Sequence, residues 1–429
     1  MPDPRGTKGR TVIAASFVTM AILYGIWYSY GVFFVAILRD LRWSRSLVAG
    51  AFSVFTLVHG ASGSFVGALS GRFGPRRVLL AGGLLLALGL VLTAQTTHWW
   101  HLYLFFAGIA ALGIGLGGFV PLVVLVREWY PSRVATMVGI ASAGIGVGIS
   151  AMGPISQFMI ERIGWRWTFR VLALVVVCWA IPSTLWLLKS RPAGASGQGE
   201  LVTDAGATLR GPSWVLRDAL GTWRFWGLSL SFMTGNVVPQ MLFVHQVAFL
   251  VDHGEAAMVA ATVAGIAGLV SIPGKFGWGV LSDRKGRELT YSLGFGCLAL
   301  SIVLLALAGR FPNSSLPYVY AIVMGAGYAV TAPVLPAISS DLFGGPGFSS
   351  IFGALHMSMG FGSALGAWGA GQIFDVTGSY ATAFGLALGF AALSPAILWI
   401  VGPRRPNPPP GRGKNRGQGP GVREQGREG

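Results

Sequence analysis

The sequence has few charged residues and almost no cysteine. Only 11% of its 429 residues are charged and 53% are hydrophobic, whereas soluble proteins carry about 25% charged residues. Cys178 and Cys297 each lie alone in an apolar stretch, which excludes a disulfide framework and a cysteine metal site. Stretches of alternating polar and apolar residues, typical of an outer-membrane barrel, are also absent. These absences exclude a soluble enzyme and leave a helical membrane protein.

Long apolar runs recur along the whole chain, and its mean hydropathy is +0.63. A helix that crosses a bilayer needs about 20 predominantly apolar residues, and many of these runs reach that length. The sequence therefore predicts an all-α membrane protein with twelve transmembrane helices. We expect them over residues 12–38, 47–70, 78–97, 102–126, 134–160, 168–188, 223–250, 257–281, 289–309, 317–340, 350–373 and 381–401.

Two polar stretches divide the chain. Residues 190–222 contain many Gly and Ser and separate the sixth predicted helix from the seventh. Residues 403–429 are rich in Pro, Gly and Arg, a composition typical of disorder. We therefore expect an N-terminal six-helix bundle over 1–189, a cytoplasmic linker, a C-terminal six-helix bundle over 223–402 and a disordered cytoplasmic tail.

The basic residues are distributed unevenly between the two membrane faces. The chain has 31 Lys and Arg against 15 Asp and Glu. With both termini on one side, 23 of the 31 fall on that side, 7 fall on the other, and Lys275 lies within a span. Because cytoplasmic loops carry such an excess, we expect a multi-pass protein of the inner (plasma) membrane with both termini cytoplasmic. The same bias accounts for the net charge of +16 without nucleic acid.

The two predicted bundles carry matching motifs. GALSGRFGPRR (67–77) follows the second predicted helix and GVLSDRKGREL (279–289) follows the eighth, and their shared residues pair at one constant offset. A second set pairs at nearly the same offset and consists of Gly139/Gly353, Gly146/Gly360, Gly148/Gly362, Glu161/Asp375 and Gly164/Gly378. Both halves begin on the same side of the membrane. The sequence thus predicts a parallel repeat with the substrate near the midplane between the halves.

The motif GVLSDRKGRE (279–288) resembles the loop motif G-x-L-x-D-R-x-G-R-[RK] of the major facilitator superfamily. GQIFDVTGSYATAF (371–384) and REWYPSRVATMVGIASAG (127–144) resemble its oxalate/formate antiporter and monocarboxylate transporter branch. The N-terminal motif copy departs from the pattern, with Gly71 in place of the Asp. The resemblance implies the major facilitator fold and a gate on the cytoplasmic side. The residues expected to form this gate are Arg72, Arg76, Asp283 and Arg284.

No carboxylate lies in the middle of a predicted span. All 15 acidic residues fall at helix ends, in loops, in the linker or in the tails. Proton-driven carriers of drugs and sugars usually need a buried acid, which loads and releases a proton. The absence of one argues against such carriers and favours an anion carrier, in which a proton travels on the substrate itself.

Lys275 is the one Lys or Arg that lies more than a turn from both ends of a predicted span. It lies eight residues before Asp283, about 12 Å along a helix, in a hydrocarbon layer about 30 Å thick. An unpaired cation at that depth costs a few kcal/mol, which favours a water-filled cavity that a carboxylate can enter. The resemblance implies a substrate role too, because monocarboxylate transporters carry an Arg four residues before the motif Gly. The alternative is a lysine that extends to the cytosolic interface.

Other polar and aromatic side chains are candidates for the wall of the cavity. Asn236, Gln240 and His245 recur at helical spacing in the seventh helix, and the resemblance implies a cation near His356. The alternative for the histidines, and the favoured one for His59, is a hydrogen bond between helices. The candidate aromatic residues, for which core packing is the alternative, are Tyr24, Trp27 and Tyr28 of the first helix and Tyr328 of the tenth, which Pro333 and Pro336 are expected to break.

Nothing in the sequence indicates an enzyme, a nucleotide-binding loop, a cofactor or a metal site. We expect secondary transport of a small organic anion, a mono- or dicarboxylate, by alternating access, coupled by proton symport or anion exchange. The expected partners are this anion, a proton in the case of symport, and membrane lipid, and we expect a monomer. Two alternatives stay open: an exporter of apolar drugs or other small molecules, and a transport-inactive sensor or assembly protein with the same fold.

Overall fold

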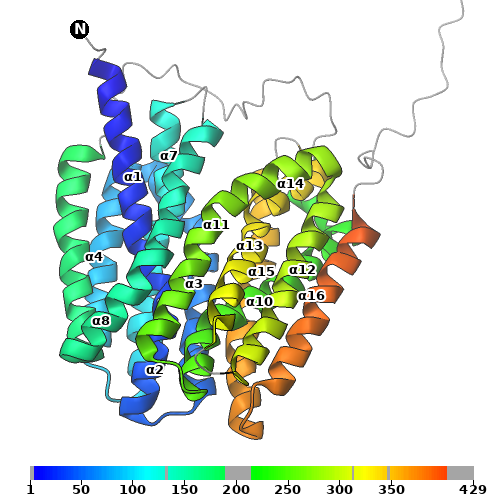
Figure 1. Cartoon of the computed structure of the whole chain (residues 1–429). Helices are drawn as coiled ribbons and strands as arrows, with labels where there is room; N and C mark the ends of the chain where they lie inside the picture. Colours follow the sequence, from blue (N-terminus) through cyan, green and yellow to red (C-terminus); the bar gives the residue numbers. More distant parts are fainter. Residues whose placement is uncertain (1–3, 131–133, 189–213, 312–313, 345–347, 403–429) are drawn as a thin grey trace, which may run out of the picture.

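The computed structural model describes residues 4–130, 134–188, 214–311, 314–344 and 348–402. Every regular element within these ranges is a helix, as the sequence predicts. The helices run side by side, with those up to α8 on one side of the molecule and those from α10 onward on the other (Figure 1). Most of the expected linker and the whole expected tail lie outside the described residues.

The elements before residue 189 cover the first six predicted helices. They are α1 (Pro4–Tyr28), α2 (Tyr30–Leu41), α3 (Arg45–Phe73), α4 (Pro75–Thr93), α5 (Trp99–His101), the π-helix η1 (Leu102–Ala110), α6 (Ala111–Gly117), α7 (Phe119–Trp129), α8 (Val134–Pro182) and the π-helix η2 (Ser183–Leu187).

The elements after residue 213 cover the other six predicted helices. They are the short α9 (Leu216–Leu220), followed by α10 (Trp223–Asp252), α11 (Ala257–Lys285), α12 (Arg287–Ala308), α13 (Leu316–Ala329), α14 (Thr331–Phe343), α15 (Phe348–Thr377) and α16 (Ala381–Val401).

These elements account for twelve crossings. Ten stretches of the described residues are long and apolar enough to span a membrane. One of them, Met137–Leu187, has 51 residues and joins two helices at Gly164, where φ is 76°. It therefore supplies two crossings, and the 30-residue α15, which is not among the ten, supplies the twelfth.

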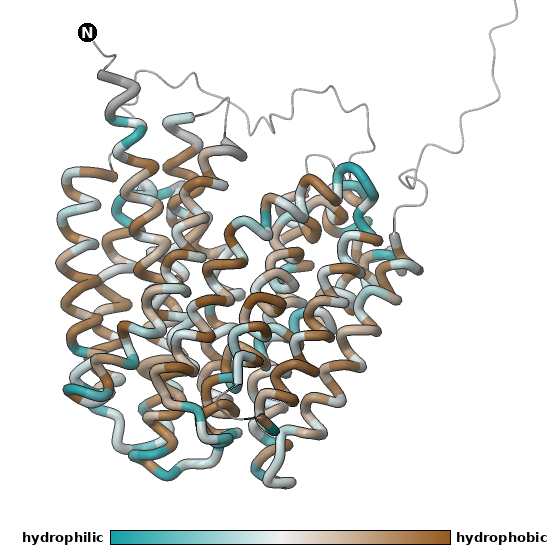
Figure 2. The backbone as a smooth tube through the Cα atoms, in the orientation of Figure 1, coloured by the Kyte–Doolittle hydropathy of each residue, from teal (hydrophilic) through white to brown (hydrophobic). Residues whose placement is uncertain are grey.

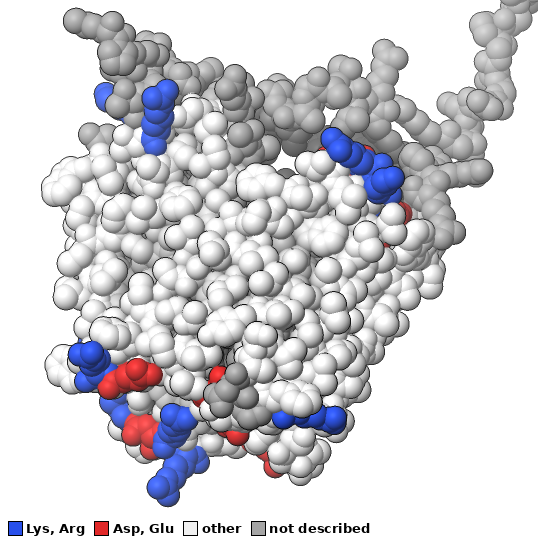
Figure 3. Space-filling view, viewed as in Figure 1, with Lys and Arg blue, Asp and Glu red and all other residues white. Residues whose placement is uncertain are grey.

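Polarity is distributed along the helices as in a membrane protein. Hydrophobic residues dominate the middle of the helices and hydrophilic ones their ends (Figure 2). The charged residues of the visible surface gather at the two ends, with an uncharged band between them (Figure 3). This band matches the hydrocarbon layer of a bilayer. We call the end that carries the N-terminus and the end of α16 the terminal face (Figure 1), and the other end the opposite face.

The predicted repeat recurs in the backbone. Gly74 and Gly286, a pair from the first set of motifs, follow α3 and α11 with φ of 82° and 95°. Gly164 and Gly378, a pair from the second set, follow the fifth and eleventh crossings with φ of 76° and 69°. Such positive φ values favour glycine because a Cβ would clash. The matching motifs therefore mark the same turns in both halves, and the expected parallel repeat is confirmed.

Two helix breaks also match across the repeat. The fourth crossing is interrupted at Gly118, between α6 and α7, and the tenth at Val330, between α13 and α14. The offset between these two positions is the same as that between Gly74 and Gly286. The break near Pro333 is an expected one, because proline cannot donate the helical hydrogen bond to the carbonyl four residues earlier. The break expected at Pro336 is not found, since this residue lies inside α14, which continues to Phe343. The backbone leaves the helical conformation at Gly118, where φ is -100° and ψ is -136°, whereas Val330 keeps helical dihedrals of -63° and -31°.

Candidate functional site

The two halves touch closely at the opposite face through α3 and α15. A Cβ added at Gly371 would lie 2.9 Å from the carbonyl of Arg45. About two turns further in, Ser53 Oγ donates to the carbonyl oxygen of Ala364 at 2.7 Å. A Cβ at Gly360 would still lie 3.8 Å from the carbonyl oxygen of Thr56. The two helices are therefore antiparallel and packed together over their opposite-face halves.

The same helix faces separate toward the terminal face. Gly63 and Gly353 lie about five turns from Arg45 and Gly371 along the same helix faces. A Cβ added at Gly60, Gly63 or Gly353 would nonetheless meet no atom of the described residues within 4 Å. The helices α3 and α15 thus diverge beyond Thr56 and Gly360, and the space between the halves widens toward the terminal face.

The helices α8 and α11 repeat this arrangement. A Cβ at Gly265 would lie 2.5 Å from the carbonyl oxygen of Ser150, and one at Gly146 would collide with Ile272. One at Gly139, two turns further toward the terminal face, would meet nothing within 4 Å in the part of the chain that the structure describes. Both pairs of helices that join the halves therefore separate at a similar depth.

Lys275 lies on α11 one turn beyond Ile272, where α8 and α11 separate. The lipid-exposed side of α11 carries Leu269, Phe276 and Val280, which are 53%, 63% and 52% exposed. Each residue turns a helix by about 100°, so Lys275 lies off this exposed side, between the contacts with α8 and those with α13. The side chain is half-buried, and none of the described residues forms a hydrogen bond or ion pair with it.

The aromatic side chains of α1 form a stack between the two helix breaks. Trp27 stacks on Tyr24 and Tyr28, with ring centroids 5.5 and 5.6 Å apart. The hydroxyl of Tyr24 lies 3.4 Å from the position of a Cβ at Gly118. The hydroxyl of Tyr28 shares a hydrogen bond of 3.0 Å with that of Tyr328, just before the break at Val330. Tyr28, at one end of the stack, thus meets Tyr328 of the other half.

Unpaired polar atoms surround this stack. Nε1 of Trp27, Nδ1 of His59 and Oε1 of Gln240 are buried, and none of the described residues forms a hydrogen bond with them. The ring of His59 lies edge-on to Trp27 at 4.5 Å. His356, on α15 in the other half, is exposed and close enough to interact electrostatically with His59. Buried polar groups normally have partners, so this cluster favours water or a polar ligand.

Asn236 and His245 instead use their polar atoms to hold α10 against α15. The amide of Asn236 donates to the carbonyl oxygen of Met359 at 2.9 Å and to Ser363 Oγ at 2.5 Å. Both ring nitrogens of His245 form hydrogen bonds, to the Tyr380 hydroxyl at 2.9 Å and the Ala367 carbonyl oxygen at 2.8 Å. The structure therefore places these two apart from the aromatic stack.

A polar network joins the halves at the opposite face, and the sequence analysis did not predict it. Arg45 donates to Asp252 at 2.5 Å and to the Tyr380 hydroxyl at 2.7 Å. The carboxylate of Asp375 accepts from the backbone N–H groups of Arg45 and Ser46 at 2.9 and 2.7 Å. The first turn of α3 is thus capped by a residue of the other half. We call Arg45, Asp252, Asp375 and Tyr380 the opposite-face latch.

The residues predicted to gate the terminal face make contacts within their own halves. Arg76 donates to the carbonyl oxygens of Thr184 and Leu185. Asp283 pairs with Arg287, which also contacts Asp341 at 3.2 Å. Arg72 and Arg284 are exposed. A gate between the halves on this face stays a prediction for a different conformation.

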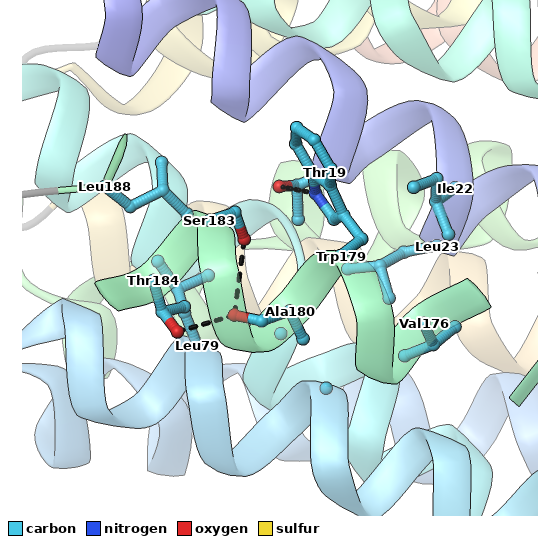
Figure 4. A pocket seen from close by; sticks show the side chains of 12 residues that line it. Thr19, Ile22, Leu23, Leu79, Val176, Trp179, Ala180, Ser183, Thr184 and Leu188 are labelled. Carbon is cyan, nitrogen blue, oxygen red and sulfur yellow. Dashed lines mark hydrogen bonds between the residues drawn. The ribbon is translucent and has the colours of Figure 1, made fainter. Parts of the chain in front are cut away.

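Two pockets differ sharply in size and lining. The first lies within the N-terminal half, between α1, α4 and α8, where Trp179 Nε1 donates to Thr19 Oγ1 at 2.9 Å (Figure 4). Its volume is about 20 Å³, enough for about one water molecule. The second, of about 560 Å³, lies at the opposite face beside the latch. No group of three His, Cys, Asp or Glu among the described residues could hold a metal ion.

The family model of the Major Facilitator Superfamily matches residues 16–319 and 278–425. The chain belongs to this superfamily. Its members are transporters rather than enzymes. Monocarboxylate transporter 13 of Bos taurus is 28% identical over 403 residues, covering 92% of this chain and 89% of the relative. Monocarboxylate transporter 2 of Homo sapiens is 25% identical over 423 residues, covering 94% and 86%. The predicted superfamily and its monocarboxylate transporter branch are confirmed.

Solved structures show the same fold. A bacterial homologue of the human lysosomal transporter Spinster, in an inward-facing and occupied conformation, superposes with a TM-score of 0.70 at 15% identity. The match covers 94% of this chain and 97% of that one. The major facilitator fold that the sequence motifs implied is therefore confirmed.

Proposed function

We propose that this transporter moves a small organic anion, a mono- or dicarboxylate, by alternating access, and that Lys275 binds the carboxylate. The observation that carries the proposal is an ammonium group without a protein partner among the described residues, placed where α8 and α11 separate. A cation in a membrane protein costs several kcal/mol unless water or a counter-charge meets it. A carboxylate that enters from the wide side of the passage would supply that charge.

The aromatic stack would form the rest of the site. Tyr24, Tyr28 and Tyr328 offer hydroxyl donors, and Trp27 and His59 offer buried nitrogens without partners among the described residues. His356 would line the terminal-face side of the passage, and Gln240 would offer an amide beside Tyr28. Asn236 and His245 would act on the site indirectly, by holding α10 against α15. The names of the relatives support a monocarboxylate as substrate.

The proposed membrane orientation rests on the distribution of basic residues, and the proposed moving bodies rest on the internal repeat. The basic excess around the termini supports a cytoplasmic terminal face in the inner (plasma) membrane, and the bundles 1–189 and 223–402 would be the moving bodies of a monomer. Arg72, Arg76, Asp283 and Arg284 would close the terminal face in the other state. Coupling would be by proton symport or by exchange for a second anion.

The test is the removal of one charge. Lys275→Ala should weaken the binding of mono- and dicarboxylates about 30-fold or more, because a desolvated charge pair is worth roughly 2–5 kcal/mol. Thermal shift of the purified protein reports binding, and counterflow uptake in liposomes reports transport. Lys275→Arg should keep part of both. Lys285→Ala, an exposed cation in the last turn of the same helix, is the control and should change neither.

A second function is favoured by the aromatic stack alone. An exporter of apolar drugs would use the same rings without needing Lys275. Uptake of hydrophobic cations that survives Lys275→Ala unchanged would support that function and contradict the first. A complete lack of flux for any cargo would instead support a sensor or assembly role.

A further inference from the structure

His245 is a buried histidine with both ring nitrogens engaged. Its side chain lies on α10, and the residue is 1% exposed. Nε2 lies 2.8 Å from the carbonyl oxygen of Ala367, and Nδ1 lies 2.9 Å from the hydroxyl of Tyr380. The same hydroxyl lies 2.7 Å from a guanidinium nitrogen of Arg45, in the other half. His245 is therefore one hydrogen bond away from the opposite-face latch.

Three hydrogen bonds link the Ala367 carbonyl, His245, Tyr380 and Arg45 in series. The groups at the two ends of this series, the carbonyl and the guanidinium, determine which atom donates in each bond. The Ala367 carbonyl can only accept, so Nε2 of His245 carries a hydrogen and donates it. A neutral imidazole has a single N–H, so Nδ1 is bare and accepts from the Tyr380 hydroxyl. The guanidinium of Arg45 can only donate, so the same hydroxyl oxygen accepts from it. With a neutral His245 whose Nδ1 is unprotonated, every hydrogen bond in this series has one donor and one acceptor, and no hydrogen is left without a partner.

Few charged or titratable groups face His245. From α3 comes Arg45, from α15 comes Asp375, and both are close enough to interact electrostatically with the imidazole. Tyr380 lies in the turn before α16, and burial raises the pKa of its hydroxyl, so it stays a neutral donor. Asp252 and His253, at the end of α10, bond to Arg45 and to the Phe249 carbonyl oxygen. From α2 the imidazole meets the ring of Phe34 at 5.2 Å.

Tyr380 connects His245 to the opposite face. Tyr380, Arg45, Asp252 and His253 all line the pocket of about 560 Å³ beside the latch. A hydronium ion in this pocket gives a proton to the Tyr380 oxygen as the hydroxyl hydrogen passes to Nδ1. Two O–H bonds break, in the hydronium ion and in Tyr380, one O–H bond and one N–H bond form, and the positive charge moves from the hydronium ion to the imidazole. This route binds a proton without a carboxylate in the middle of a membrane-spanning helix.

We propose that Nδ1 of His245 is a proton-binding site whose occupancy releases the opposite-face latch. After Nδ1 is protonated, its N–H points at the Tyr380 hydroxyl, which previously donated a hydrogen bond to Nδ1. The Tyr380 oxygen then receives donors from both sides, and an imidazolium stands one hydroxyl away from the guanidinium of Arg45. Repulsion between these cations and the loss of the acceptor both weaken the contact between the halves. A proton taken up from the opposite face would thus open that face.

The latch can be followed by a distance between spin labels. Arg39 and Val376 are exposed at the opposite face in different halves, and cysteines at both, in a Cys178→Ser/Cys297→Ser background, accept labels. We expect a longer distance population that grows severalfold as the pH falls from about 8 to about 4, a range that extends to histidines whose charged form is disfavoured by burial. His245→Asn keeps an amide oxygen as acceptor but cannot become charged, so its distance should stay short throughout.

Two further variants make the result decisive. His253→Asn, which changes a histidine of the same helix that does not bond to Tyr380, should keep the response of the parent protein. Tyr380→Phe, which removes the relay oxygen, should open the latch at every pH and lose the response even if His245→Asn does not fold. A response retained in His245→Asn or in Tyr380→Phe, or none in the parent protein, would overturn the proposal.

The inference depends on the proposed function only for its use in coupling. Lys275→Ala removes the proposed carboxylate anchor but leaves the chain from Arg45 to His245 intact. It should therefore keep the pH response while losing the binding of carboxylates. If instead carboxylates bind Lys275→Ala normally while the pH response follows His245, the substrate proposal fails and the proton site stands.

Discussion

The two faces of the molecule hold the halves together very differently. At the opposite face, Arg45 and the first N–H groups of α3 bond to Asp252, Asp375 and Tyr380 of the other half. At the terminal face, Arg76 and Asp283 bond within their own halves. Glycines on the same helix faces are tightly packed at one end and open at the other. The difference identifies a state that is closed at the opposite face and open toward the termini.

The largest effect on this difference between the faces is expected from a bulky side chain placed in the closed opposite face. Gly371→Leu places a side chain 2.9 Å from the backbone of Arg45, where nothing flexible can move aside. Overpacking costs about 1–3 kcal/mol, so transport should fall about 5- to 150-fold, toward the upper end. Spin labels at positions 39 and 376 should report an open opposite face. Gly369→Leu, on the same helix with nothing within 4 Å, should behave as the parent; equal losses in both would contradict the packing argument.

The matching wedge at the open face should act on a different step. A side chain at Gly353 has free space in this state, so Gly353→Leu should bind carboxylates within about twofold of the parent. It lies on the helix face that must meet α3 when the terminal face closes, so turnover should fall by about the same 5- to 150-fold range. Thermal shift measures carboxylate binding and liposome uptake measures turnover, so the two measurements together separate an effect on binding from an effect on turnover. Loss of binding together with turnover would show that the open face is misassigned.

The latch can be weakened without a wedge. Asp375→Asn removes the charge that caps α3 but keeps one amide oxygen as acceptor. Losing a cap costs about 1 kcal/mol, so the open population at the opposite face should rise about fivefold in the spin-label measurement. Asp341→Asn, an acidic residue at the other face that contacts Arg287, is the control and should leave that population unchanged.

The smallest effect is expected at the terminal face. The side chain of Asp283 is 70% exposed, and its partner Arg287 begins the next helix, α12, beyond the turn at Gly286; an exposed ion pair of this kind is worth roughly 0.2–1 kcal/mol. Asp283→Asn should therefore shift the melting temperature of the purified protein by a degree or so, on the order of that energy. A larger loss of turnover than of stability would support its proposed gating role in the other state.

The sequence predicted the crossings and the repeat because both leave local signals. Apolar runs set the length of helices, and Gly74/Gly286 and Gly164/Gly378 recur because each turn needs a positive φ. Pro333 predicted a break in the tenth helix, and the break lies three residues earlier, at Val330. The matching break at Gly118 was missed, since nothing in a run of glycines tells a packing contact from an interruption.

The opposite-face latch could not be predicted from the sequence, because no local pattern marks its residues. Arg45, Asp252 and Asp375 each resemble ordinary charges at a helix end, and their contact depends on how α3 meets α10 and α15 from the other half. Glu161/Asp375 was recognised as a repeated pair, but the repeat says nothing of Asp375 capping α3. His245 was predicted as a substrate ligand because its spacing from Gln240 is helical, a pattern that cannot reveal Tyr380 as its partner.

The paired interruptions at Gly118 and Val330 have a consequence for selectivity. The non-helical backbone at Gly118 lies beside the Tyr24 hydroxyl, which also interacts with the backbone of Phe119, and Tyr328 directly precedes the break at Val330. Some of the polarity at the aromatic stack therefore belongs to the polypeptide backbone itself. Side-chain replacement leaves those dipoles in place. Variants stripped of their charged anchor should therefore retain a weak, broad preference for hydrogen-bonding solutes instead of becoming indifferent to cargo.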